Sequence, residues 1–183
     1  MPRLTLSITI IALFLTGCAA VMNQLSGRGV VSVQKSAIDE SEVVTVSGNN
    51  VVGNAGMSSF DGALLGARWE SITPETVYVD VSYTSSANDE PIVIDFDELR
   101  VNIDGTVSSF RPLAPGKINM PLAYLESMLR AGSCKLQLVR GSKLTDGDFA
   151  IAFDADKPMA KASLQRFYDR VLEVKAERMS KQL

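Results

Sequence analysis

The clearest pattern in the chain is an alternation of two kinds of residue between positions 77 and 84, in the segment VYVDVSYT. Its odd-numbered positions are valine or tyrosine, and its even-numbered positions carry hydroxyl or carboxylate groups. Such alternation is typical of a strand in an antiparallel sheet that has one buried face and one wet face. Residues 98–103 and 106–110 also read as strands, and the Asp104–Gly105 pair between them predicts a tight hairpin turn.

Shorter strand signals lie on both sides of these segments. Runs rich in β-branched or alternating apolar residues predict strands at 30–33, 42–46, 64–69, 134–140 and 148–153. The Gly- and Asn-rich run Gly48–Ser59 predicts a loop, and residues 141–147 predict a turn region.

Two segments change to a helical period. Leu122, Leu125 and Leu129 fall on one helical face after Pro121, and Gly132 marks a stop for this short helix. Apolar residues recur at helical spacing behind Pro158 and predict an amphipathic helix over 159–181. The expected fold is mainly β (α+β): one antiparallel β-sandwich-like domain over 30–183, with one short inserted helix and a C-terminal amphipathic helix.

The N-terminus has a different pattern. A single Arg3 precedes an apolar stretch from Leu4 to Leu15, which is too short to span a bilayer but fits the core of a secretory signal. The stretch ends in Leu15-Thr16-Gly17-Cys18, which resembles the lipobox of bacterial lipoproteins. The resemblance implies that residues 1–17 are a signal peptide and that Cys18 becomes the lipidated first residue of the mature chain.

The same resemblance implies a location. Acyl chains such as palmitate on Cys18 would hold the protein at a membrane, because two or more chains anchor stably where one does not. Residues 18–29 would form a lipidated tether between the membrane and the folded domain. Ala19 and Ala20 follow the cysteine in place of aspartate, and in this family that favours the outer membrane, with the domain facing the periplasm.

The composition and net charge of the chain argue against several classes of function. The formal net charge is −3, which disfavours a nucleic-acid partner because phosphates require a basic surface. The chain contains no histidine, and this excludes Ser-His-Asp and Cys-His catalysis and most zinc sites. We therefore expect a protein that is not an enzyme, has no cofactor and holds no metal.

Several residues are candidates for a functional site. Cys134 shares a strand face with Leu136 and Leu138, so burial is expected rather than thiol chemistry. Two acidic clusters, one on a strand face and one in a loop, could bind a cation, but both are interpreted as solvated. The members of these clusters are Asp95, Asp97 and Glu98, and Asp146 and Asp148.

Two functions are favoured, and an enzyme that works through Asp and Glu alone is a third, disfavoured because other site elements are missing. The first is a non-enzymatic scaffold or adaptor that contacts another envelope protein through an edge strand or the C-terminal helix. The alternative is a small-molecule or glycan-binding module that uses a sheet face with Arg68, Trp69 and Tyr78, under a lid formed by Gly48–Ser59. An anionic groove is a further candidate, but pairing of the arginines with neighbouring acids is the simpler interpretation. Its lining residues would be Arg68, Trp69, Arg100 and Arg111.

Overall fold

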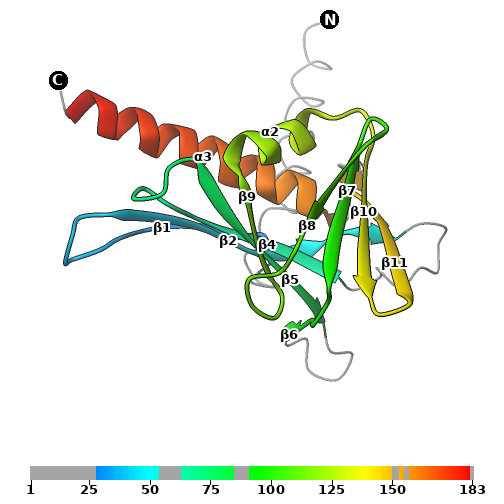
Figure 1. Ribbon diagram of the computed structural model, residues 1–183. Helices are drawn as coiled ribbons and strands as arrows, with labels where there is room; N and C mark the ends of the chain where they lie inside the picture. Colours follow the sequence, from blue (N-terminus) through cyan, green and yellow to red (C-terminus); the bar gives the residue numbers. More distant parts are fainter. Residues whose placement is uncertain (1–27, 54–62, 85–90, 150–152, 155–156, 182–183) are drawn as a thin grey trace, which may run out of the picture.

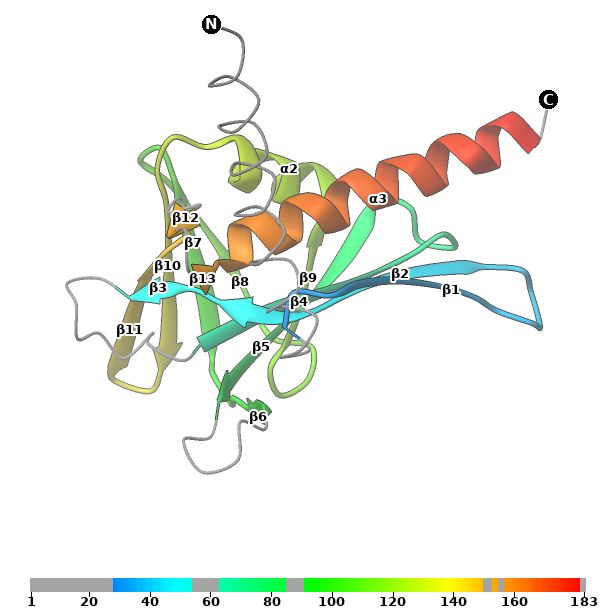
Figure 2. The same ribbon diagram turned by 180° about the vertical axis from the view of Figure 1, so that it is seen from behind.

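The computed structural model describes residues 28–53, 63–84, 91–149, 153–154 and 157–181 (Figure 1). Within these ranges the chain forms two larger antiparallel sheets, one small two-stranded sheet and two helices, so the expected mainly β, sandwich-like α+β fold is confirmed. The long C-terminal helix lies across the first sheet, and the second sheet stands beside it (Figures 1 and 2).

The first sheet has six strands in the order β1-β2-β4-β5-β6, with β9 also paired to β5. These strands are β1 (Val31–Lys35), β2 (Glu42–Asn50), β4 (Ala63–Glu70), β5 (Thr76–Thr84), β6 (Pro91–Val93) and β9 (Lys117–Pro121). The second sheet has the order β3-β11-β10-β7-β8. Its strands are β3 (Val52–Gly53), β7 (Glu98–Ile103), β8 (Thr106–Phe110), β10 (Cys134–Arg140) and β11 (Lys143–Asp148). The small sheet pairs β12 (Phe153–Asp154) with β13 (Lys157–Pro158).

The core lies between the sheets and the helices. Val77, Val79 and Val81 of β5 are buried, as their alternation predicts. The helix α3 (Ala160–Lys181) matches the expected C-terminal helix, and it buries Phe167 and Val171 against the first sheet. Fully burying a side chain of this kind contributes about 1.5–3 kcal/mol, so the contact between α3 and the sheet is a major source of stability.

The hairpin at Asp104–Gly105 is confirmed. Strands β7 and β8 have the predicted bounds, and the two turn residues have φ angles of 48° and 94°. Asp104 and glycine tolerate such left-handed angles, and two of them in sequence make the turn that suits a twisted two-stranded ribbon. The amide of Gly105 donates a 2.9 Å hydrogen bond to the side chain of Asn102, which closes the turn.

Two loop predictions are wrong in part. Gly48 to Asn50 belong to β2 and Val52–Gly53 form β3, so the predicted loop loses its first half. Residues 54–59 of that loop lie outside the described residues. Residues 141–147 are not a turn region, because a tight turn at Gly141–Ser142 leads directly into β11. The sequence of β11, KLTDGD, shows no hydrophobic alternation, because its inward-facing residues are Thr145 and Gly147. They lie opposite Leu138 and Leu136 of β10.

Other boundaries also differ from expectation. The strand predicted at 148–153 is wrong in position, because Asp148 ends β11 and residues 150–152 lie outside the described part of the chain. The short helix α2 (Leu122–Arg130) exists, but extended backbone at Ala131, with φ −61° and ψ 140°, ends it before Gly132. Strand β9 was missed because prolines at 115 and 121 frame it, although Ile118 and Met120 alternate inward as in any half-buried strand.

Candidate functional site

Three elements meet at one end of the molecule, which we call the open end. They are the β1–β2 turn (36–41), the β4–β5 turn (71–75) and the last turns of α3 (175–181), and they lie at the same end in both views (Figures 1 and 2). Backbone contacts join the two turns, because the amide of Ser71 donates to the carbonyl of Glu42 at 2.9 Å. The amide of Glu42 donates in return to the hydroxyl of Ser71, also at 2.9 Å.

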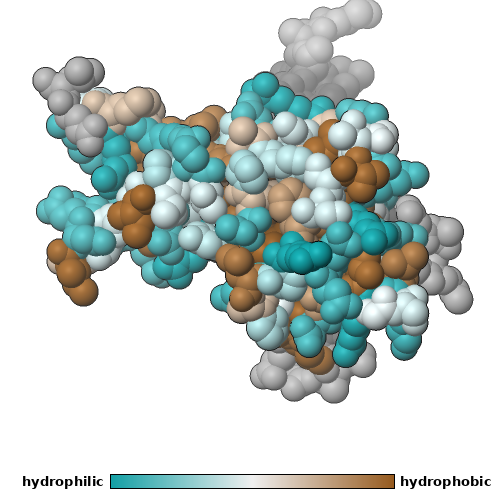
Figure 3. Space-filling view, viewed as in Figure 1, coloured by the Kyte–Doolittle hydropathy of each residue, from teal (hydrophilic) through white to brown (hydrophobic). Residues whose placement is uncertain are grey.

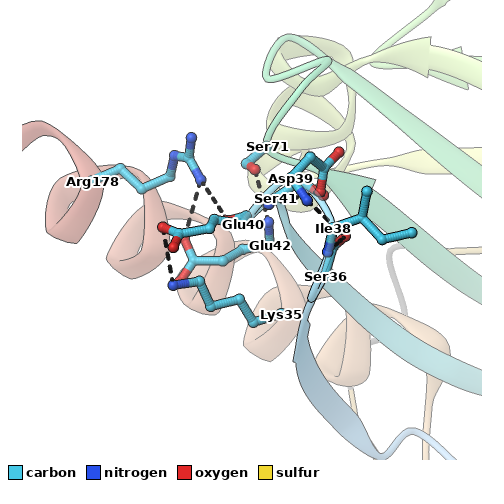
Figure 4. A network of polar contacts seen from close by, with 9 residues as sticks. All are labelled: Lys35, Ser36, Ile38, Asp39, Glu40, Ser41, Glu42, Ser71 and Arg178. Carbon is cyan, nitrogen blue, oxygen red and sulfur yellow. Dashed lines mark hydrogen bonds and ion pairs between the residues drawn. The ribbon is translucent and has the colours of Figure 1, made fainter.

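Charged side chains tie α3 to both turns, and Figure 4 shows the contacts at the β1–β2 turn. Arg178 lies 3.6 Å from the carboxylate of Glu42 and donates a 3.5 Å hydrogen bond to the backbone carbonyl of Glu40. Lys175 donates to Glu75 at 2.8 Å, so a second cation of the same helix reaches the other turn. The open end is therefore a single surface built from three separate parts of the sequence.

The β1–β2 turn is shaped by its own side chains. Asp39 accepts hydrogen bonds from the amide of Ser41 at 3.0 Å and from its hydroxyl at 2.7 Å. Hydrogen bonds from Ser36 and Ser41 lower the pKa of Asp39 to about 2, because they favour the charged carboxylate. Glu40 has a left-handed φ of 56°. The fold of the turn leaves the side chain of Ile38 97% exposed.

Exposed apolar side chains occur on each of the three elements. Ile38 stands on the β1–β2 turn, Ile72 on the β4–β5 turn with 62% exposure, and Met179 on α3 with 62% exposure. Figure 3 shows apolar side chains at this end of the molecule, where both turns project. The sequence signal for the two isoleucines was available: in KSAIDES and ESITPE, one isoleucine interrupts a polar turn.

A groove of about 440 Å³ lies between the β1–β2 turn and the end of α3. The groove is lined by Lys35, Asp39, Glu40, Glu42, Arg178 and Lys181. Three of these side chains are cationic and three are acidic, and Lys35 already pairs with Glu40 at 3.4 Å. Mixed charge beside protruding apolar side chains is typical of a protein-docking surface.

The predicted ligand face is only partly assembled. Arg68 of β4 and Tyr78 of β5 are direct partners in the sheet register, and Asn119 of β9 is next in the row. The prediction that Trp69 lies on this face is wrong. Neighbouring residues of a strand point to opposite faces, and the side chain of Trp69 is buried with 0% exposure. Its indole nitrogen donates a 3.0 Å hydrogen bond to the carbonyl of Pro74. The first half of the predicted lid lies in β2 and β3, and its second half, 54–59, lies outside the described residues.

The structure does not assemble the two acidic clusters in the way the sequence suggested. Asp95 and Asp97 do not share a strand face, because residues 94–97 form no strand, and Asp97 accepts a 2.6 Å hydrogen bond from the amide of Gly141. Glu98 accepts from Arg100 at 2.8 Å, and hydrogen bonds from Ser109 and Arg100 lower its pKa. Asp146 lies in β11 rather than in a loop. In the described ranges, no three acidic or thiol side chains gather closely enough to hold a metal ion.

A second groove lies on the outer face of the second sheet and was not predicted. Its volume is about 350 Å³, and its polar lining comes from Arg100, Asn102, Lys135, Gln137 and Asp146. Gln137 joins the row by accepting from Arg100 at 3.3 Å and donating to Asp146 at 2.8 Å. Arg100 therefore pairs with neighbouring groups, as expected from the sequence, and Arg111 is exposed after β8.

Cys134 is buried with 0% exposure, which confirms the interpretation of this residue as a small core side chain. Burial raises the pKa of its thiol to about 12, so the nucleophilic thiolate is suppressed. Cys18 lies outside the described residues. Within the described part of the chain, neither helix is long and apolar enough to cross a membrane.

Comparison with protein-family models, with curated proteins and with solved structures finds no match to this chain.

Proposed function

We propose that this protein is a lipid-anchored adaptor of the cell envelope, held at the membrane by acyl chains on Cys18, with its domain facing the periplasm. Its open end is the docking surface for another envelope protein. The observation that carries the docking proposal is the exposure of Ile38, Ile72 and Met179 on three elements that meet at one end. The lipobox-like segment Leu15–Cys18 carries the anchoring proposal.

The folded domain begins before the predicted end of the tether at residue 29, because Gly29 already packs on the domain. Gly29 is buried with a φ of 63°, and its carbonyl accepts a 3.2 Å hydrogen bond from Arg166 of α3. Ten peptide steps separate Cys18 from Arg28, so the chain between them spans at most about 35 Å when fully extended. This length lets the domain stand clear of the bilayer and reach a membrane-associated partner.

The open end has the composition of a protein contact. Apolar side chains at its three prominences supply area that is removed from water on binding. The mixed charges of Lys35, Glu42 and Arg178 between them supply directional contacts. A partner that fits would present an apolar patch bordered by charges of both signs.

Anchoring is tested by metabolic labelling with a palmitate analogue and by intact-mass analysis of the membrane-extracted protein. We expect the acyl chains and the loss of residues 1–17 in the native chain. The Cys18→Ser variant should lose both the label and membrane retention. A native chain that keeps its N-terminus and carries an unmodified Cys18 would overturn the anchoring proposal.

Docking is tested by crosslinking in intact cells. The Ile38→Asp and Ile72→Asp variants should lose a crosslinked partner that the unchanged chain captures, because each places a charge where apolar area is buried. Leu113→Asp is the matched control, since Leu113 is 64% exposed but lies away from the open end, between β8 and β9. Equal capture by all four chains would reject the open end as the docking surface.

A second candidate function rests on the groove over the second sheet. Its volume of about 350 Å³ falls in the range of small-ligand sites, and Arg100 and Lys135 suit a carboxylate beside hydroxyl groups. The probe is glucuronate, with glucose as the neutral control, followed by amide chemical shifts. Shifts at 135–137 that occur with glucuronate and disappear in Lys135→Ala would support this function, and unchanged spectra would exclude this ligand class.

A further inference from the structure

Strand β1 is the outer strand of the first sheet, and in the described part of the chain no strand lies along its second edge. The amide of Ser36 donates to Ser41 at 2.7 Å, and the amide of Ser47 donates to Val30 at 3.1 Å. Hydrogen-bonded pairs alternate along an antiparallel ladder, so the even-numbered residues of β1 face β2. The backbone groups of Val31, Val33 and Lys35 are therefore directed to the outer edge.

This edge has little protection against pairing. Natural proteins guard an exposed strand with proline, a bulge, inward-pointing charges or lysines. The β1 sequence VSVQK has no proline, and its single charge is the terminal Lys35. The side chain of Val33, at the centre of the strand, is 37% exposed. An edge strand with an exposed valine at its centre and a single charge at its end can accept another strand.

We propose that two copies of this chain pair along β1, edge to edge and antiparallel, with Val33 of each copy opposite Val33 of the other. Ser32 then stands opposite Gln34 of the second copy, and Val31 stands opposite Lys35 of the second copy. Val31, Val33 and Lys35 form hydrogen-bonded pairs across the seam, and each pair exchanges two backbone bonds. The two first sheets become one continuous sheet.

The β1 sequence is self-complementary, which favours a second copy over a foreign strand. A twofold interface requires the strand to suit its own reversed sequence, because residue i of one copy contacts residue j of the other and residue j contacts residue i. Valine against valine is a favourable cross-strand pair, and serine suits glutamine. The two lysines lie four residues apart along the seam, about 13 Å at 3.3 Å per residue, so their repulsion is largely screened by salt.

The neighbouring helix does not oppose this approach. Arg170 of α3 pairs with Glu173 at 2.7 Å and with Glu177 at 3.6 Å. Arg166, on the same helix, donates to the backbone of Gly29 at the start of β1. The helix side chains near this edge thus carry both signs and are largely paired, so two copies do not meet with fields of one sign.

The pairing of Val33 with itself gives a distinctive test. The full-length chain carrying Cys18→Ser is studied by sedimentation equilibrium in density-matched mild detergent. We expect a dimer whose dissociation constant rises at least about tenfold in Val33→Lys and in Val33→Glu, because each variant opposes two like charges. A one-to-one mixture of the two variants should restore the dimer, because lysine then faces glutamate.

Val33→Thr is the matched control, since it keeps the β-branched shape and adds no charge; it should dimerise as the unchanged chain does. Circular dichroism establishes that the charged variants fold, because position 33 is partly exposed. A monomeric unchanged chain would overturn the proposal, and so would a dimer that Val33→Lys does not weaken. Loss of a crosslinked foreign protein in Val33→Lys, with a monomeric unchanged chain, would assign the edge to that protein instead.

The pairing is independent of the adaptor function. It needs neither acyl chains nor a partner at the open end, and the Cys18→Ser background removes the lipid. A chain that dimerises but captures no envelope protein would support the pairing and reject the adaptor function. A chain that stays monomeric but captures an envelope protein would support the adaptor function and reject the pairing.

Discussion

The side-chain amide of Asn49 donates a buried 2.7 Å hydrogen bond to the hydroxyl of Ser163, which joins β2 to α3 across 114 positions of sequence. Both side chains are almost fully buried, with exposures of 1% and 0%. The hydroxyl of Ser163 donates in turn to the carbonyl of Met159. This contact fixes where the C-terminal helix crosses the first sheet, and hence where its far end reaches the open end.

Ser163→Ala should destabilise the protein by about 1–3 kcal/mol, because it leaves the buried amide of Asn49 without its acceptor. Urea unfolding measures the change. Ser180→Ala on the same helix is the control: its hydroxyl donates to the carbonyl of Glu177 in an exposed position, so its loss should change stability by less than about 0.5 kcal/mol. Equal effects of the two substitutions would show that the Asn49–Ser163 bond contributes nothing particular.

Gly29→Ala should cost more than Gly141→Ala. Both glycines have left-handed φ angles, 63° and 56°, so both substitutions incur the same backbone strain of about 1–2 kcal/mol. A Cβ at Gly29 would lie 2.3 Å from the hydroxyl oxygen of Ser163, whereas a Cβ at Gly141 meets nothing within 4 Å. The difference between the two unfolding free energies therefore reports how tightly the start of the domain packs on α3. Similar values would argue that the tether is not held there.

The elements that could be predicted from the sequence are those whose signal is local. The alternation at 77–84, the Asp104–Gly105 turn and the helical spacing behind Pro158 each specify a structure from neighbouring residues. All three are present with nearly the expected bounds. Strand β11 was not predicted because its inward-facing residues, Thr145 and Gly147, are not hydrophobic side chains. Its sequence therefore shows no hydrophobic alternation.

The open end could not be predicted because it depends on tertiary contacts. Arg178 reaches Glu42 only because α3 runs along β2, and no local pattern relates residues so far apart. Each isoleucine of the two turns could be noted in the sequence, but not their convergence at one end. The ligand face failed at Trp69 for a simpler reason: adjacent residues of a strand cannot share a face.

Trp69 offers a direct optical check, because it is the only tryptophan of the chain. With 0% exposure and its indole hydrogen bond to Pro74, it should emit at short wavelength and resist quenching by acrylamide. Trp69→Phe should destabilise by about 1–3 kcal/mol, since the carbonyl of Pro74 loses its donor and a smaller ring fills the site. If acrylamide quenches the emission as strongly as that of free tryptophan, Trp69 is exposed to solvent and its burial is contradicted.

We expect the thiol of Cys134 not to react with thiol reagents in the native protein. In a Cys18→Ser background it is the only cysteine, and burial keeps it inaccessible and protonated. We expect Ellman's reagent to react only in urea, whereas an added Ser142→Cys in the exposed β10–β11 turn should react at once. Immediate reaction of native Cys134 would contradict the burial.

The same burial predicts a loss of stability at alkaline pH. The pKa of the Cys134 thiol rises from 9.0 to about 12 on folding, so the folded state holds its proton more tightly than the unfolded state. The stabilisation is complete below pH 9 and is lost as the pH rises from 9 towards 12. Between pH 8 and 10.5, the free energy of unfolding should therefore fall more steeply for the unchanged chain than for Cys134→Ala. Cys134→Ala is less stable at neutral pH because it leaves a small cavity, so the slopes and not the absolute values are compared. Parallel slopes would show that the thiol ionises equally well in the folded and unfolded chains.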